Sequence, residues 1–131
     1  MKQKKNVSEI NLDNKIILIR VDYNVPIKDN IIQNTYRIDQ TIQTINYCLN
    51  NNVKKIILIS HLGKPNGVFN EELSLYPVKD YLEKKYNFDI DLCGLFNIQT
   101  SNKKITLLEN IRFYNNEVNY KDNSFLKKYL S

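Results

Sequence analysis

Glycine is scarce in this sequence, with three residues among 131. Neither of the glycine-rich patterns that cradle nucleotide phosphates, G-x-G-x-x-G or G-x-x-x-x-G-K-[S/T], is present. No serine sits in a nucleophile elbow, and no pair of residues has the spacing of metal ligands. We therefore expect neither a bound nucleotide nor a metal ion on this stretch of chain.

Cysteines and long apolar runs are also few. Cys48 and Cys93 lie far apart, outside any CxxC or mixed His/Cys pattern. The polar, lysine-rich start is not followed by the apolar segment of a signal peptide. The longest apolar runs, such as Ile16–Ile19 and Ile56–Ile59, are too short to cross a bilayer. These features favour a cytoplasmic protein with reduced thiols and without a membrane span.

The charge is moderately positive, because 19 Lys and Arg face 14 Asp and Glu for a formal net charge of +5. An excess of this sign favours an anionic partner, but a scattered excess is also typical of a solvated surface. A basic nucleic-acid-binding protein is the weaker alternative. The lysines form no stripe with interleaved aromatic residues, and arginines are few.

The apolar pattern predicts an α/β fold with a parallel sheet flanked by helices. Short β-branched runs with little alternation indicate strands buried on both faces. An apolar stripe with helical spacing lies between the first two strands and ends at three asparagines, and a shorter helix follows Ser74, a plausible N-cap. The expected strands are 15–21, 53–60, 105–109 and a short edge strand at 88–92; the expected helices carry the stripe Ile38, Ile42, Ile45 and Leu49, and span 76–85 and 124–129.

Polar side chains follow three of these strands, where each strand ends. In open α/β sheets, ligands bind at the carboxyl ends of the strands. The groups expected at this edge are Asp22, Asn24, His61, Lys64 and Arg112, joined by Arg37 from the start of the first helix. Arginine binds carboxylates and phosphates through two parallel hydrogen bonds, so the set predicts a site for a small polyanion.

Each of these residues also has a purely structural interpretation. Asp22 and Asn24 are typical of a turn before Pro26, and His61 is typical of a satisfied polar residue at a strand end. Arg37 is compatible with a helix flank, and Arg112 with an ion pair to a nearby glutamate. Their convergence on one sheet edge is what favours a binding site.

At these same positions the sequence resembles the phosphoglycerate kinase family. The matching segments occur in the family's order and cover nearly the whole chain after the first dozen residues. Arg20–Pro26 resembles RVDFNVP, Tyr36–Ile38 resembles TRI with Thr44–Ile45 in the helix that follows, Ser60–Pro65 resembles SHLGRP, Ser74–Val78 resembles SLxPV, and Leu107–Phe113 resembles LLENxRF.

The resemblance implies an N-terminal domain, residues 1–131, of a monomeric two-domain enzyme. That enzyme transfers a phosphoryl group between 1,3-bisphosphoglycerate and ADP, giving 3-phosphoglycerate and ATP in glycolysis. It implies that Arg37 is catalytic. The residues implied to bind substrate are Asp22, Tyr23, Asn24, Arg37, His61, Leu62, Gly63, Lys64 and Arg112.

Two departures from the family pattern qualify this expectation. Lys64 stands where the family has arginine, which keeps the charge but loses the forked geometry. The family's later substrate-binding strand and its nucleotide-binding domain have no counterpart here, so we expect Mg-ATP or Mg-ADP to bind outside this stretch, on a downstream part or on a separate C-terminal piece. The chain alone is expected to be inactive, and a catalytically dead triose-phosphate or anion-binding module is the alternative function.

Overall fold

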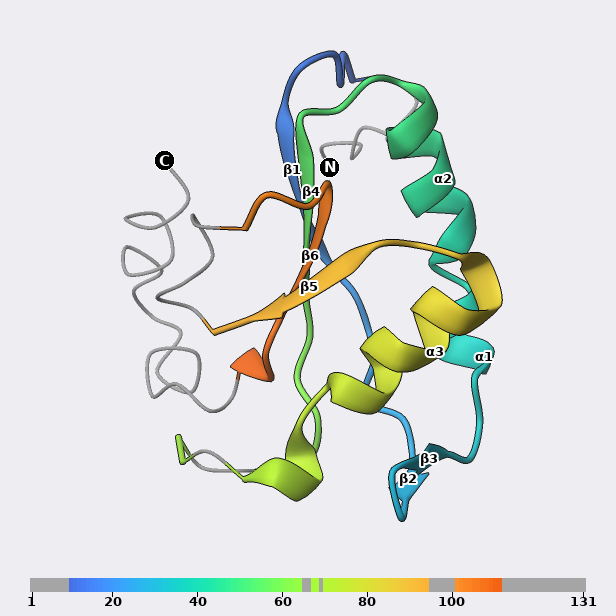
Figure 1. Ribbon diagram of the computed structural model, residues 1–131, viewed down its shortest axis with the longest axis vertical. Coiled ribbons are helices and arrows are strands. Elements are labelled where there is room, and N and C mark those ends of the chain that lie inside the picture. Colours follow the sequence, from blue (N-terminus) through green and yellow to red (C-terminus); the bar gives the residue numbers. More distant parts are fainter. Residues whose placement is uncertain (1–9, 65–66, 69, 95–100, 112–131) are drawn as a thin grey trace, which may run out of the picture.

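The computed structural model describes residues 10–64, 67–68, 70–94 and 101–111, and Figure 1 shows how their elements are arranged. They contain one four-stranded sheet in the order β1-β4-β6-β5. Its strands are β1 (Ile16–Arg20), β4 (Lys55–Ile59), β6 (Ile105–Leu108) and β5 (Ile90–Cys93). Every neighbouring pair in this sheet is parallel. The predicted α/β class and all four predicted strands are confirmed, with bounds shifted by one or two residues.

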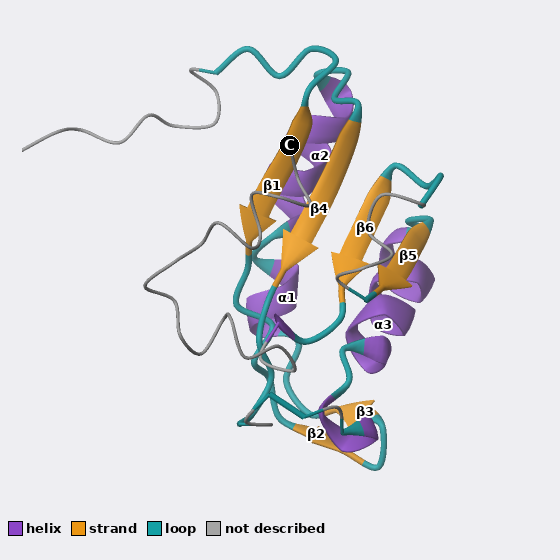
Figure 2. Cartoon of the chain, turned by 90° about the vertical axis from the view of Figure 1, so that its left-hand side faces the viewer, coloured by secondary structure: helices purple, strands orange, loops and turns teal. Residues whose placement is uncertain are grey.

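The helices of the described region are α1 (Tyr36–Asp39), α2 (Ile42–Asn50), the single-turn η2 (Glu71–Leu73) and α3 (Tyr76–Tyr86). In Figure 2, which views the sheet face-on, α1, α2 and α3 lie behind the strands, on one face of the sheet. No helix in the described part of the chain is long and apolar enough to cross a membrane. The helix expected at 124–129 lies outside the described residues.

The core forms between this face of the sheet and the helices. Parallel register aligns Ile56, Ile105 and Ile90 in one row, and Leu58 and Leu107 in the next. These side chains pack with buried residues of the helices in a single cluster, which includes Ile38, Ile42, Ile45, Cys48, Val78 and Leu82. Burial of large apolar side chains contributes roughly 1.5–3 kcal/mol each, so this layer supplies much of the stability.

The opposite face of the sheet is covered unevenly. On β4, Ile57 and Ile59 are each 4% exposed, as predicted for a strand buried on both faces. On β1, Ile16 is 49% and Leu18 is 45% exposed. The prediction that β1 is buried on both faces is therefore wrong. In the described sheet β1 lies at an edge, and its apolar run faces the helices only with alternate residues.

The predicted helix between the first two strands is broken into α1 and α2 at Gln40 and Thr41. Both the backbone N–H and the hydroxyl of Thr41 donate to the carbonyl of Ile38, at 3.1 and 2.8 Å. A threonine side chain that bonds a carbonyl of the preceding turn competes with the regular helical ladder and bends the chain. Ile38 and Ile45 nevertheless stay buried, at 0% and 1% exposure, because the break preserves the apolar stripe.

The ends of α2 and α3 carry the residue types that the sequence suggested for helix termini. Helix α2 ends at Asn50, and Asn52 has a φ of 57°, the left-handed conformation that asparagine tolerates. Ser74 does not occupy the formal N-cap position of α3, which is Leu75, but its hydroxyl still accepts the N–H of Tyr76 at 3.1 Å. The helix then ends at Asn87, again with a left-handed φ of 59°.

A small antiparallel hairpin, β2 (Ile27–Lys28) and β3 (Ile31–Ile32), was not predicted. Its two turn residues, Asp29 and Asn30, have φ values of 50° and 63°. Two successive positive φ angles are the mark of the type I′ turn, whose twist matches a hairpin. Each strand has only two residues, too few for the alternation of a strand to be read from the sequence.

The two faces of the sheet generate a prediction about stability. Leu58→Ala should lower the free energy of unfolding by about 2–5 kcal/mol, because it removes a fully buried side chain and leaves a cavity. Leu18→Ala, the control in a neighbouring strand, should cost less than about 1 kcal/mol because Leu18 is 45% exposed. Urea unfolding followed by circular dichroism measures both. Equal losses in the two variants would contradict the assignment of the core to the helix-covered face.

Candidate functional site

The carboxyl ends of the parallel strands meet at one edge of the sheet, where the arrowheads of Figure 2 point. Backbone hydrogen bonds continue past the strands and keep the following loops together. The N–H of Val21 donates to the carbonyl of Ile59 at 2.8 Å, and the N–H of Ile111 donates to the carbonyl of Ser60 at 3.0 Å. Segments 21–24, 60–64 and 109–111 therefore lie side by side, as the predicted site requires.

Arg37 reaches from α1 to the loop after β1. Its Nη1 atom lies 3.2 Å from a carboxylate oxygen of Asp22 and donates to the backbone carbonyl of Asn24 at 3.1 Å. The ion pair is open to solvent, with side-chain exposures of 55% for Arg37 and 61% for Asp22. Exposed pairs of this kind contribute little stability. The guanidinium is thus aimed at the site, and an incoming anion can replace the carboxylate at small energetic cost.

Asn24 connects the first loop to the second. Its side-chain carbonyl accepts the backbone N–H of Gly63 at 3.1 Å. Gly63 has a φ of 61°, a conformation that residues with a side chain rarely adopt. A Cβ atom at this position would also lie 2.7 Å from a methyl carbon of Leu73. Glycine is therefore required for the loop after β4 to approach both Asn24 and Leu73.

Ser60 and Tyr23 join β4 to the loop after β1. The buried hydroxyl of Ser60 accepts the N–H of Tyr23 at 2.9 Å. The Tyr23 ring is 0% exposed, and its hydroxyl lies 2.7 Å from the hydroxyl of Thr41. Burial raises the pKa of Tyr23 to about 12, against the smaller opposing effect of the Thr41 hydrogen bond. The phenol is neutral at physiological pH and acts as a packing group.

Asn110 holds the third loop to the second, and it was not singled out as a site residue from the sequence. Its side chain is fully buried and accepts the N–H of Leu62 at 3.1 Å. It also donates to the carbonyls of Leu62, at 2.6 Å, and Leu73, at 2.9 Å. Glu109 next to it accepts from the Ser74 hydroxyl at 2.6 Å and from the N–H of Leu75 at 2.8 Å. The sequence signal that could have identified Asn110 is its place, with Glu109, in a pair of polar residues directly after an apolar strand.

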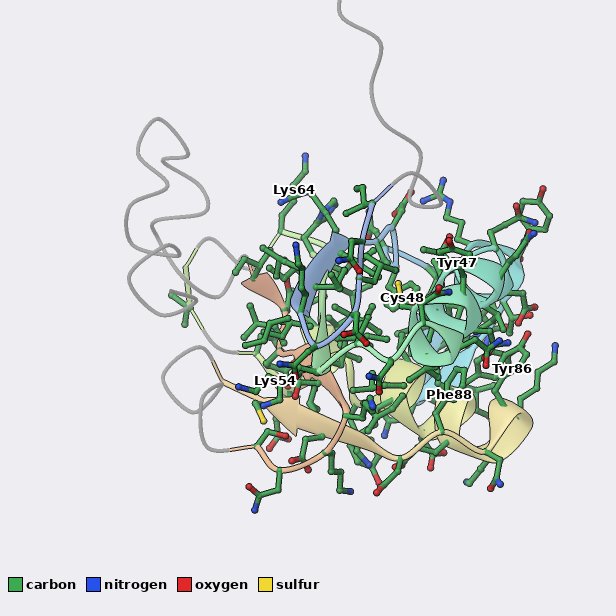
Figure 3. All side chains as sticks on the ribbon, turned by 90° about the horizontal axis from the view of Figure 1, so that it is seen from above. Tyr47, Cys48, Lys54, Lys64, Tyr86 and Phe88 are labelled. Atoms are coloured by element: carbon green, nitrogen blue, oxygen red, sulfur yellow. The ribbon has the colours of Figure 1, made fainter. Side chains whose placement is uncertain are left out.

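The structure brings most of the predicted site residues to one place. The contacts above link Asp22, Asn24, Arg37 and Gly63, and His61 and Lys64 lie in the same loop as Gly63. Lys64 is exposed and extends outward from the body of the molecule (Figure 3). Arg112 lies outside the described residues. Whether each of these residues binds a ligand stays a prediction.

Three of the predicted residues hold the loops together through their backbone N–H groups. The Tyr23 and Leu62 side chains are buried, at 0% and 5% exposure. The N–H groups of Tyr23, Leu62 and Gly63 donate to Ser60, Asn110 and Asn24. The described contacts of these three residues shape the loops around the site.

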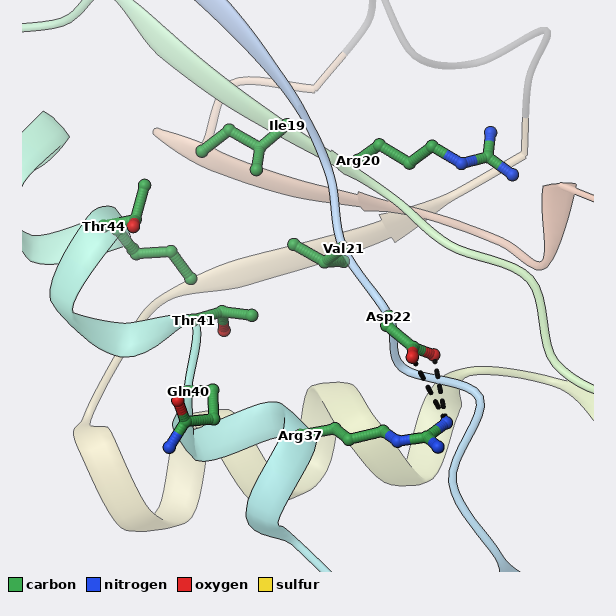
Figure 4. A pocket seen from close by; sticks show the side chains of 9 residues that line it. Ile19, Arg20, Val21, Asp22, Arg37, Gln40, Thr41 and Thr44 are labelled. Atoms are coloured by element: carbon green, nitrogen blue, oxygen red, sulfur yellow. Dashed lines mark hydrogen bonds and ion pairs between the residues drawn. The ribbon is translucent and has the colours of Figure 1, made fainter. Parts of the chain in front are cut away.

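A pocket of about 340 Å³ lies beside the Arg37–Asp22 pair, between the end of β1 and the two short helices (Figure 4). Its polar lining combines the ion pair with Gln40, Thr41 and Thr44. The pocket also has apolar walls, which are formed by Ile19, Val21 and Ile45. Within the described residues, no three His, Cys, Asp or Glu side chains are grouped so that they could hold a metal ion.

Fold and site together define an α/β protein with a basic, polar site at the carboxyl ends of its parallel strands. Comparison with known proteins makes the assignment specific: the family model for phosphoglycerate kinase matches residues 7–131, and the chain belongs to this family. It is 42% identical over 124 residues to the phosphoglycerate kinase of Helicobacter pylori (strain ATCC 700392 / 26695). It is 45% identical over 111 residues to that of Euplotes crassus.

Solved structures agree with these relationships. The structure of phosphoglycerate kinase from Coxiella burnetii matches with a TM-score of 0.72 and 35% identity, over 82% of this chain and 28% of that one. The crystal structure of the enzyme from Pyrococcus horikoshii OT3 matches with a TM-score of 0.69 and 26% identity, over 86% and 29%. The predicted resemblance to the N-terminal portion of the family is confirmed.

The chain spans part of the length of its relatives. The match covers 89% of this chain and 31% of the Helicobacter protein, and 79% of this chain and 27% of the Euplotes protein.

The buried asparagine yields a second prediction. Asn110→Ala should lower the free energy of unfolding by about 1–3 kcal/mol, because buried backbone groups of Leu62 and Leu73 would lose their partner. Asn50→Ala, at an exposed position in the last turn of α2, is the matched control and should change stability by less than about 0.5 kcal/mol. Thermal unfolding compares the two. A neutral Asn110→Ala would show that these hydrogen bonds do not hold the loops.

Proposed function

We propose that this chain supplies the triose-phosphate site of a phosphoglycerate kinase. The whole enzyme would transfer a phosphoryl group from the acyl phosphate of 1,3-bisphosphoglycerate to the terminal phosphate oxygen of ADP. The P–O bond to the acyl oxygen breaks, a P–O bond to ADP forms, and 3-phosphoglycerate leaves as a carboxylate. The observation that carries the proposal is the Arg37 guanidinium, aimed from α1 at Asp22 and Asn24 on the edge where the strands end.

Arg37 is the group best suited to act on the phosphoryl group in flight. Phosphoryl transfer depends on positioning and on stabilising charge that is spread over the phosphoryl oxygens. The guanidinium is permanently charged, half-exposed and held by a weak, replaceable ion pair. On substrate binding it would exchange the Asp22 carboxylate for phosphoryl oxygens without moving its helix.

The neighbouring groups would hold the rest of the substrate. Asp22 can accept hydrogen bonds from a glycerate hydroxyl once Arg37 has turned to the phosphoryl group. Asn24 would position the glycerate from the same loop. His61, Lys64 and Arg112 would bind the phosphate of the non-reacting end, and Tyr23, Leu62 and Gly63 would shape the loops that surround it.

In this proposal the nucleotide and its magnesium ion bind outside the described residues. The described residues contain neither a group of side chains suited to a metal ion nor a glycine-rich loop for phosphates. They do not fit Mg-ADP, so no step is assigned to them through it. A separate or downstream part of the protein would bind the nucleotide and present it to the acyl phosphate.

A binding experiment on the 131-residue chain tests the first half of the proposal. Titration with 3-phosphoglycerate, followed by two-dimensional NMR, should shift the amide signals of residues 22–24 and 61–64 and leave those of α3 unchanged. Arg37→Ala should weaken binding, and Lys54→Ala should not, because Lys54 is exposed at the opposite end of β4. The same chain should form no ATP from 1,3-bisphosphoglycerate and ADP. Absence of binding at millimolar ligand would refute the proposed site, and ATP formation would refute the division of labour.

A kinetic experiment on a reconstituted enzyme tests the role of Arg37. The rest of a relative's chain would be supplied by fusion or by mixing. Arg37→Ala should then lower kcat by about 10³-fold or more and raise KM by about 10-fold at most, because an arginine that acts on the transition state of phosphoryl transfer contributes more there than to substrate binding. Lys54→Ala is again the control. A rise in KM at constant kcat would instead make Arg37 a binding residue.

A further inference from the structure

The carboxylate of Asp39 lies at the centre of a hydrogen-bonded cluster between α1 and α3. One oxygen accepts the hydroxyls of Tyr81, at 2.6 Å, and Tyr86, at 2.5 Å. The other accepts the hydroxyl of Thr35 at 2.9 Å. The ammonium of Lys85 lies 3.4 Å from the first oxygen. We call these five residues the Asp39 cluster.

The cluster is a built part of the structure and not a chance surface contact. The Asp39 side chain is only 28% exposed, and the Tyr81 and Tyr86 rings meet edge to face at 6.3 Å. The Lys85 ammonium lies 5.4 Å from the centre of each of these rings. Three hydroxyl donors and one cation thus satisfy one carboxylate. Hydrogen bonds to a charged acceptor are stronger than those between neutral groups.

Helix α1 depends on contacts of this kind. It has four residues, and its N-cap residue, Thr35, makes no side-chain capping hydrogen bond. An isolated single turn is unstable in water because its nucleation cost is not repaid. Two side chains hold α1 in place: Ile38, fully buried in the core, and Asp39, bonded to α3. The hydrogen bond from the Thr35 hydroxyl to the Asp39 carboxylate also links the N-cap residue to the last residue of this turn.

Arg37 lies in the same turn and points the other way. Residues two apart on a helix are separated by about 200° around its axis, so Arg37 and Asp39 project to nearly opposite sides. Arg37 contacts Asp22 and Asn24, whereas Asp39 contacts α3. A rotation or shift of α1 that loosened the Asp39 cluster would therefore displace the guanidinium from the site.

We propose that Asp39 is a positioning residue for Arg37, anchoring the turn that carries it to Tyr81, Tyr86 and Lys85 of α3. The anchoring of Arg37 follows from the geometry of this chain alone. Its consequence for ligand binding rests on the proposed function. If α1 is released, only the fraction of molecules with Arg37 in place binds well, and apparent affinity falls by that fraction.

The ionisation of Asp39 supports this arrangement. Burial alone would raise its pKa, but the hydroxyl donors and the Lys85 ammonium outweigh it and lower the pKa to about 2. The cluster therefore contributes stability that is present above about pH 4, the ordinary carboxyl range, and is lost as the pH falls towards 2. The groups that face Asp39 are Thr35, Tyr81, Tyr86 and Lys85. The hydrogen bond to Asp39 raises the pKa of Tyr86, and the hydrogen bond to Tyr81 raises the pKa of Lys85, so neither of these two changes charge in acid. The pKa of Glu83 of α3 is lowered by its hydrogen bond from Lys79, so comparison with Asp39→Asn separates the effect of the cluster from that of Glu83.

The test measures the order of the Arg37 side chain in the 131-residue chain by NMR relaxation of its Nε–H group. Asp39→Ala should lower the order parameter of this group to below about 0.6, the range of flexible groups. The amide signals of β4 and β6 should persist. Asp80→Ala is the matched control, since it removes a carboxylate of α3 whose partner, Lys84 at 2.9 Å, lies outside the cluster. It should leave Arg37 unchanged.

The double variant Tyr81→Phe and Tyr86→Phe provides a second route if Asp39→Ala does not fold, because it keeps the rings and removes only the two hydroxyl donors. It should also loosen Arg37. In Asp39→Asn the acid-induced loss of order of the α1 amides between about pH 4 and 2 should be smaller than in the parent chain. Unchanged Arg37 order in the folded Asp39→Ala variant, or in the double variant, would overturn the proposal.

Titration with 3-phosphoglycerate separates this proposal from the proposed function. Asp39→Ala should raise Kd by about 3- to 10-fold relative to the parent chain, and Asp80→Ala should not. If the parent chain does not bind the ligand but Arg37 still loosens in Asp39→Ala, the positioning role stands and the proposed function fails. If the parent chain binds and Kd is the same in the folded Asp39→Ala variant, the positioning role fails and the site remains.

Discussion

The parallel alignment of β1, β4, β6 and β5 is the constraint on which the rest of the structure depends. A parallel strand must return through a crossover, and α2 and α3 lie in the crossovers from β1 to β4 and from β4 to β5, over one face of the sheet. The same alignment brings the carboxyl ends of β1, β4 and β6 to a single edge. Groups separated by dozens of residues, such as Asp22, Gly63 and Ile111, become neighbours for this reason. A single antiparallel strand among the three would remove its loop from the site.

The frame of the site and its reactive group are held by different kinds of interaction. Buried, neutral hydrogen bonds of Ser60 and Asn110 fix the loops, and breaking them would leave polar groups unsatisfied in the interior. Arg37 is instead held by an exposed ion pair with Asp22, which water and ligands can replace. The loops are therefore rigid where they must keep a shape, and the guanidinium is exchangeable where an anion would arrive.

Helix α1 takes part both in the buried contacts and in the exposed ion pair. Ile38 ties it to the core, Asp39 ties it to α3, and Arg37 carries the charge to the sheet edge. A turn this short has no stability of its own, so its placement is decided entirely by what its side chains contact. This is also why the break at Gln40 and Thr41 matters. The break separates α1 from α2, so the orientation of α1 is set by its contacts with the site and with α3.

The four strands of the main sheet, the α/β class, the family and most of the polar groups at the sheet edge were predictable from the sequence. Continuous apolar runs such as Ile56–Ile59 report local geometry directly, and the rule that ligands bind beyond parallel strands then groups Asp22, Asn24 and His61. The burial of Tyr23, the clamp of Asn110 on Leu62 and the separation of α1 from α2 could not be read from the sequence. The first two depend on hydrogen bonds between residues 18 to 48 positions apart, and local periodicity carries no information about such pairs. The third depends on the Thr41 hydroxyl, which donates to the nearby carbonyl of Ile38 and lies 2.7 Å from the distant hydroxyl of Tyr23.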